Sequence, residues 1–249
     1  MAPRRRCEPA RTVKYAGIDG CRGGWAVAAL SDRLTWDPPV VCPTLSDALV
    51  HSARAELTLV DIPLGLDDRR HFRACDLAAR TLLGARRSSI FAVPVRAAVH
   101  APDYATASAL NHAATGRKLS LQSWYICGKI AEADLALRSQ PSLQERLHES
   151  HPELCFTALN GWAPLSASKK TREGQAERLA LLERHTPGAV LPMGFPRSQV
   201  APDDVIDAMV LAVSAGLAAA HGLPMLPDPP EVDSYGLRMA LTLPYPPGR

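Results

Sequence analysis

The segment Lys14–Trp25 reads K-Y-A-G-I-D-G-C-R-G-G-W and decides the fold. Its apolar first half predicts a buried strand, which carries the carboxylate of Asp19 into a glycine-rich turn. A second strand over 25–30 should then return beside the first. A charge at the end of a core strand is costly unless a positive group lies nearby. Asp19 therefore either caps its own turn or meets groups from elsewhere in the chain.

A third antiparallel strand and a helix should follow this hairpin. Residues 33–36 suit the strand, which the D-P-P sequence at 37–39 should end. Thr44 with Asp47 three residues later resembles a capping box and predicts a helix over about 44–52.

A second acid stands at the end of a second core strand. The short apolar run over 57–63, L-T-L-V-D-I-P, is typical of strands covered on both faces, and the helix before it implies a parallel pairing. Asp61 lies within this run. If the run pairs beside the first strand, Asp19 and Asp61 emerge at neighbouring carboxyl ends, where open α/β sheets bind ligands. A turn-capping role stays open for Asp61 too.

Helices should dominate residues 65–150, which we interpret as an insertion in a single domain over 13–249. The predicted helices run over 73–83, 103–114 and 120–137. Residues 151–156, H-P-E-L-C-F, then suit a strand that carries Glu153. The remaining predicted elements are a polar helix over 172–184, a loop over 187–196, a helix from 202 to a glycine stop at 222, and a strand over 235–243.

The composition describes an ordinary soluble protein of 249 residues with a net charge of +3, which permits a polyanionic partner without requiring one. No apolar run approaches the roughly 18 residues that span a bilayer, so we expect no membrane partner. The six cysteines lack zinc or disulfide spacing, which fits reduced thiols in a cytoplasm. Residues 1–12 are interpreted as a flexible tail. Oligomeric state is not predicted.

The helix over 202–222 carries the most informative charge. From 205 to 220 only Asp207 and Ser214 are neither apolar nor small, so Asp207 should be buried and should need a cation or a proton. Asp203 and Asp204 share its face. Acids in a first helical turn are also stabilised by the helix dipole, which is an alternative role for these two. Several converging carboxylates repel one another unless a divalent metal neutralises them. Mg²⁺ or Mn²⁺ suits such an all-oxygen site, and two such ions can clamp a phosphodiester.

The order of elements resembles the RNase H-like fold: an α/β protein whose mixed sheet has three antiparallel strands and then parallel strands, with helices on both faces and a helical insertion. The segment D-V-I-D-A at 204–208 resembles the D-x-x-D-A of Holliday-junction resolvases. More closely, a set of motifs resembles domain-of-unknown-function family 429, whose members are expected to be nucleases of that fold. These motifs are G-I-D-G-C-R-G-G-W, V-D-I-P-L-G-L, R-R-S-S-I-F, H-P-E-L-C-F, S-K-K-T and D-D-V-I-D-A.

The resemblance extends from Tyr15 to Ala220 and implies a metal site. Its position-by-position ligands would be Asp19, Asp61, Glu153, Asp204 and Asp207, all but Asp204 also being catalytic candidates. Residues 67–96 hold seven arginines and three aspartates, which indicates either a phosphate-binding stretch or a solvated helix face. The basic and polar residues that could bind substrate are Arg86, Arg87, Ser88, Lys129, Lys169 and Lys170.

We therefore expect a metal-dependent phosphodiesterase, most simply a nuclease acting on DNA or RNA with Mg²⁺ or Mn²⁺. Two other classes stay open. A non-catalytic nucleic-acid or protein scaffold could retain the fold, and a nucleotide-binding phosphotransferase could share the same core. His151 could protonate a leaving group or could be a structural histidine beside Pro152. Gln122 and Trp124 could meet a base by hydrogen bond or stacking, although Trp124 also suits the core.

Overall fold

The computed structural model describes residues 13–31, 33–189, 195–196 and 198–247, and its centre is a five-stranded mixed sheet. The strand order is β3-β2-β1-β4-β5. Pairing is antiparallel between β1 and β2 and between β2 and β3, and parallel between β1 and β4 and between β4 and β5. The strands are β1 (Val13–Cys21), β2 (Gly24–Ser31), β3 (Trp36–Cys42), β4 (Leu57–Val60) and β5 (Leu147–Glu149). This arrangement confirms the predicted α/β class and is consistent with an RNase H-like fold.

The third strand lies later in the chain than the sequence predicts. β3 begins at Trp36, where the expected strand ended, and runs through Pro38 and Pro39. Two features make this possible. β3 is an edge strand, and its pairing with β2 shifts register between Val27 and Ala29, opposite the prolines. Proline is tolerated at such edges and irregularities because no ladder hydrogen bond is lost there.

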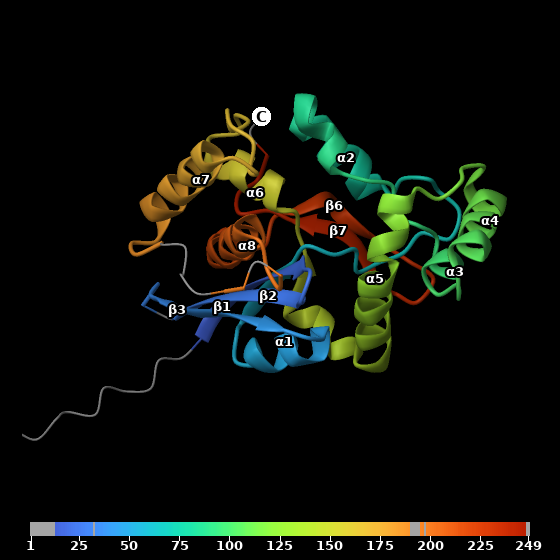
Figure 1. The fold of residues 1–249 in the computed structure, drawn as a ribbon, viewed down its shortest axis with the longest axis horizontal. Helices are drawn as coiled ribbons and strands as arrows, with labels where there is room; N and C mark the ends of the chain where they lie inside the picture. The colour runs from blue at the N-terminus through green and yellow to red at the C-terminus, as the bar shows by residue number, and fades with distance from the viewer. Residues whose placement is uncertain (1–12, 32, 190–194, 197, 248–249) are drawn as a thin grey trace, which may run out of the picture.

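Helices cover both faces of the sheet (Figure 1). On one face α1 (Leu45–His51) and α5 (Leu121–Ser139) pack over a core that includes Ile18 and Val27. On the other face α8 (Pro202–Ala220) packs over a core that includes Ala28, with α7 (Arg172–His185) and α6 (Pro152–Leu159) beyond it. The almost wholly apolar α8 is buried along most of its length, as its sequence predicts.

Between β4 and β5 the chain is helical, as expected. The elements there are α2 (Ala74–Leu83), the 3₁₀ helix Gly84–Ser89, α3 (Arg96–Val99), α4 (Tyr104–Thr115), α5 and the 3₁₀ helix Pro141–Glu145. The predicted helices over 73–83, 103–114 and 120–137 match α2, α4 and α5 within two residues. Asp103 and Ser120 cap their helices through side-chain oxygens, and Gly116 ends α4 in a left-handed conformation.

The strand predicted over 151–156 is wrong. The sheet is completed just before it by β5, and residues 152–159 form α6. Pro152 occupies the first turn of this helix, where its fixed φ suits a helix start and its missing N–H is not needed. His151 caps the helix by accepting the amide of Glu153 at 3.2 Å. Glu153 is thus a helix residue and not a strand residue.

The C-terminal elements are confirmed with one addition. α7 and α8 match their predicted ranges, and Thr44 caps α1 as expected. The predicted strand over 235–243 contains β7 (Arg238–Thr242), which pairs with an unpredicted strand, β6 (Met225–Val232). β6 contains three prolines, which conceal it from pattern recognition. The predicted tail over 1–12 and part of the predicted loop over 187–196 lie outside the described residues.

Among the described residues, no helix combines the length and apolar character needed to cross a membrane.

Candidate functional site

The first two acids lie side by side because their strands are neighbours in parallel register. Ile18 of β1 pairs with Val60 of β4, and each is followed directly by an aspartate. The amide of Asp61 donates to the carbonyl of Ile18 at 3.0 Å, which fixes this alignment. Asp19 is buried, whereas Asp61 is partly exposed. The prediction that these acids emerge at neighbouring strand ends matches this geometry.

α8 brings the third acid, Asp207, close to Asp19. This close packing depends on Gly17 of the opening segment, since a Cβ atom there would lie 2.0 Å from the carbonyl oxygen of Ala208 and 2.7 Å from Cβ of Leu211. Asp207 is only 1% exposed. Its Oδ1 is buried with no hydrogen-bond partner among the described residues. An orphaned buried carboxylate oxygen is unusual, because most buried polar atoms are satisfied.

Burial and neighbouring charges shift the ionisation of Asp19 and of Asp207. Burial raises the pKa of Asp19 well above its usual value, and the charges of Asp61 and Asp207 raise it further. Burial likewise raises the pKa of Asp207, to about 6, although Lys169 opposes this rise. Asp19, Asp61 and Asp207 therefore form one electrostatic unit, which we call the acid cluster. Close carboxylates with raised pKa values are typical of functional sites.

Lys169 supplies the direct counter-charge. Its Nζ donates to Oδ2 of Asp207 at 2.6 Å and lies 4.0 Å from Oδ2 of Asp203. Burial lowers the pKa of Lys169, but the charges of Asp207, Asp19 and Asp61 outweigh burial, so the net pKa lies above its usual value. The ammonium group therefore stays charged beside the acid cluster at neutral pH.

The two other acids of α8 have separate partners. Asp203 is buried and accepts from Nζ of Lys170 at 2.5 Å. Asp204, a predicted metal ligand, accepts the amide of Ala201 at 3.0 Å and so caps the first turn of the helix. Burial raises the pKa of Asp204, while the Ala201 amide opposes that rise. The sequence left open that these acids serve only the start of the helix. That role fits Asp204, which caps the first turn, better than Asp203, which pairs with Lys170.

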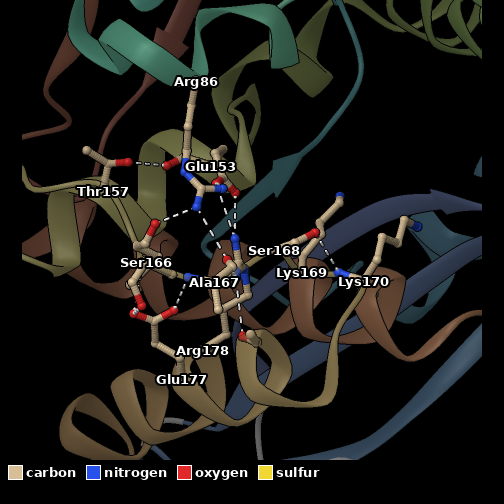
Figure 2. Close-up of polar contacts among 12 residues, drawn as sticks. Arg86, Glu153, Thr157, Ser166, Ala167, Ser168, Lys169, Lys170, Glu177 and Arg178 are labelled. Carbon is tan, nitrogen blue, oxygen red and sulfur yellow. Dashed lines mark hydrogen bonds and ion pairs between the residues drawn. The ribbon is translucent and has the colours of Figure 1, made fainter.

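Glu153 lies near the acid cluster but is fully paired. Its Oε1 accepts from Arg86 at 2.7 Å, and its Oε2 accepts from Arg178 at 3.0 Å. Figure 2 shows the two guanidinium groups converging on this carboxylate. Both arginines also donate to the carbonyl of Ala167, two residues before Lys169. These contacts describe a structural carboxylate that fixes the loop before α7, in place of the strand-borne ligand expected from the sequence.

A pocket of about 460 Å³ opens over Asp19 and Asp61. It brings together many of the predicted site residues, because β1, the segment directly after β4, the 3₁₀ helix Gly84–Ser89, α5, α6 and the loop before α7 all contribute to its wall. Its polar and charged lining consists of Asp19, Asp61, Arg86, Ser89, Gln122, Lys129, His151, Glu153, Ser168 and Lys169.

Three predicted substrate-binding residues lie elsewhere. Arg87 and Ser88 are exposed and do not line this pocket, although the adjacent Arg86 and Ser89 do. Lys170 lines a separate open cleft with Arg172 and Asp203. Lys129 does face the pocket, where it is held by the carbonyl of Gly24 and by the ring of Trp25 at 4.4 Å.

Sequence reasoning missed Arg178, which is fully buried. A signal for it exists, since Arg178 shares one helix face with Gly174, Leu181 and Leu182, all of them buried. A charged residue on the apolar face of an otherwise polar helix indicates an internal partner. That partner, Glu153, lies 25 residues away and could not be identified from spacing.

The donor chemistry of the acid cluster fits a hard divalent cation, because its groups are carboxylate oxygens and Oδ1 of Asp207 has no hydrogen-bond partner within the described residues. These carboxylates are not arranged as a complete metal-binding site. Within the described parts of the chain, no three His, Cys, Asp or Glu side chains are grouped tightly enough to hold a metal ion. The physical reason lies in the contacts above, since like charges separate and Lys169 occupies one side of Asp207.

Comparison with known proteins gives one family. A search of curated proteins and a search of solved structures each return no match. The model of a protein family of unknown function, DUF429, matches residues 17–232. That match includes the end of β1 with Asp19, the residues of the pocket wall and the whole of α8. The chain therefore belongs to the DUF429 family.

Proposed function

We propose that the pocket over the acid cluster is the active site of a metal-dependent phosphodiesterase, most simply a nuclease. The single observation that carries this proposal is Asp207, a buried carboxylate beside two others. One of its oxygens is paired to Lys169, and the other has no hydrogen-bond partner in the part of the chain that the structure describes. A buried group left in this state is stabilised when a cation binds it.

The acid cluster would hold the metal through Asp19, Asp61 and Asp207. A divalent ion bound there supplies Lewis acidity, activating water and neutralising charge on a phosphodiester. Asp204 and Glu153 take no part as ligands in this proposal, since one caps α8 and the other is paired with two arginines.

The pocket wall would bind the substrate. Lys129 and Lys169 both line the pocket and place positive charge near Asp19, and Gln122 adds a side-chain amide to the wall. Cationic side chains at this position suit the phosphates of a nucleic acid, whereas the described wall offers only the rings of Phe91 and His151 for base stacking. We therefore expect contacts to backbone phosphate to outweigh contacts to bases.

The proposal includes a cytoplasmic location. The five cysteines of the described residues, Cys21, Cys42, Cys75, Cys127 and Cys155, are all buried and free. Free buried thiols fit a reducing compartment.

The test is hydrolysis of short DNA and RNA duplexes, single strands and branched junctions in Mg²⁺ or Mn²⁺. We expect cleavage of at least one substrate, abolished by EDTA and by the double substitution Asp19→Asn/Asp207→Asn. The matched control is Asp47→Asn, which removes an exposed acid of α1 that does not line the pocket.

Two results would refute this function. Equal cleavage by the Asp19→Asn/Asp207→Asn variant would show that the chemistry lies elsewhere. Metal-dependent stabilisation without turnover on any of these substrates would instead favour a non-catalytic role for the same site.

A further inference from the structure

Lys169 stands in the acid cluster where a metal ion would be expected. Its Nζ donates to Oδ2 of Asp207 at 2.6 Å and lies within electrostatic reach of Asp19 and Asp61. The two partners differ in exposure: the Lys169 side chain is 40% exposed, and that of Asp207 is 1% exposed. The lysine can therefore leave toward solvent, whereas the carboxylate cannot.

The backbone that carries Lys169 is held in place independently of this ion pair. Glu177 accepts the amides of Ser166 and Ala167, each at 3.0 Å (Figure 2). Arg178 donates to the carbonyl of Ala167 at 3.2 Å. Gly174 of α7 lies so close to the carbonyl of Ser168 that a Cβ atom there would be 1.9 Å away. Moving Lys169 therefore requires rotation of its flexible side chain only.

The charge at the cluster remains incomplete with Lys169 in place. Lys169 donates a hydrogen bond to one of the three carboxylates, and Oδ1 of Asp207 stays without a hydrogen bond among the described residues. Lysine is a compact point charge with no second positive charge to offer, whereas a divalent ion neutralises more of the cluster and can contact several oxygens.

We propose that Lys169 is the resident cation of the acid cluster and that a divalent metal ion displaces it from Asp207. This inference rests on the proposed function, because it assumes that the cluster binds metal. Metal binding then includes the cost of breaking the Lys169–Asp207 pair, so Lys169 lowers the affinity for metal. The released ammonium stays at the pocket mouth, where a substrate phosphate would lie, because its backbone remains fixed.

Calorimetric titration of the full chain with Mn²⁺ tests this exchange. We expect Lys169→Met to bind Mn²⁺ roughly tenfold or more tightly than the natural protein, the scale of one charge-assisted hydrogen bond. Lys169→Arg should resemble the natural protein because it keeps the charge. The matched control is Lys170→Met, which removes the neighbouring lysine and its pair with Asp203. Its affinity should stay within about twofold, because that pair lies outside the acid cluster.

A second measurement needs no substitution, so it stands even if Lys169→Met fails to fold. Lysine-specific acylation followed by mass spectrometry should show faster modification of Lys169 at saturating Mn²⁺, with Lys170 unchanged. An unchanged rate at Lys169 overturns the exchange. Equal or weaker Mn²⁺ binding by folded Lys169→Met also overturns it and leaves the proposed function intact. Absence of Mn²⁺ binding in every variant, including the natural protein, removes the proposed function together with this inference.

Discussion

Glu153 and Asp207 are both buried carboxylates, yet their surroundings differ. Glu153 lines the pocket, whereas Asp207 does not line it and instead pairs with Lys169, which does. Glu153 receives two guanidinium groups, so both of its oxygens are paired. Asp207 receives one ammonium group, and its Oδ1 has no partner among the described residues. A completed set of partners holds structure in place, whereas an incomplete set leaves capacity for a ligand. Burial alone therefore does not separate a structural acid from a functional one.

The largest expected effect comes from removing one of the two arginines that pair with Glu153. Arg178→Met leaves Glu153 with only the partly exposed Arg86 and removes the contacts to the carbonyl of Ala167 in the loop and to that of Gly174 in α7. We expect a loss of about 3–5 kcal/mol in the free energy of unfolding, measured in urea, because a buried charge loses its main partner. Arg184→Met, an exposed arginine of the same helix, should change stability by less than about 0.5 kcal/mol. A loss below about 1 kcal/mol for Arg178→Met would contradict a structural role for Glu153.

The next effect concerns the contact that assembles the acid cluster. Gly17→Ala places Cβ against the backbone of α8, so the helix must shift away from β1. We expect a loss of about 3 kcal/mol in unfolding free energy, at the upper end for overpacking. The control is Gly128→Ala in α5, where a Cβ atom meets nothing within 4 Å. That change should stabilise the protein by up to about 1 kcal/mol, since alanine favours helix. Equal effects at the two glycines would show that β1 and α8 are not tightly packed.

A smaller effect, on the pH dependence of the unfolding free energy, should come from Asp207, the carboxylate with only one paired oxygen. Because the pKa of Asp207 rises from 3.8 to about 6 on folding, the folded state holds a proton that the unfolded state has released. The stability contributed by this group is present below pH 4 and is lost as pH rises through 6. Asp207→Asn removes this dependence. The unfolding free energy of the variant, relative to the natural protein, should increase by on the order of 2–3 kcal/mol from pH 4 to pH 7 in EDTA. A difference that stays constant across this range would place Asp207 outside the titrating cluster.

The smallest effect separates two neighbouring arginines. Arg86→Met removes a partly exposed partner of Glu153, and we expect a loss of about 1 kcal/mol in urea unfolding because Arg178 remains. Arg87→Met should be nearly neutral, since its side chain is exposed and makes no ion pair among the described residues. If Arg87→Met cost as much as Arg86→Met, general charge rather than the specific contact to Glu153 would explain both.

Much of the fold could be predicted because its signals are local. The caps of α4 and α5 stand within the sequence of each helix, and the apolar run of β4 is short and distinct. β5 has only three residues, which is too few for a periodic pattern. The strand was therefore predicted over 151–156 instead. Pro152 was the available signal for a helix start at that point.

The acids of the site could be predicted because their positions in strands and in an apolar helix are visible in the sequence. Asp19 and Asp61 follow paired residues of parallel strands, and Asp207 interrupts an otherwise apolar helix. The partners of these acids could not be predicted in the same way. Lys169 reaches Asp207 across 38 residues from a loop without periodicity, so only the folded backbone defines the pair.

The two prolines of β3 affect how copies of this protein meet one another. An edge strand normally offers a row of amide and carbonyl groups on which a second chain can extend the sheet. Pro38 and Pro39 supply no amide hydrogens, and at the opposite edge β5 is only three residues long and buried. Neither edge of the main sheet is therefore a good template for intermolecular strand addition, and the fold carries its own protection against growth into fibrils.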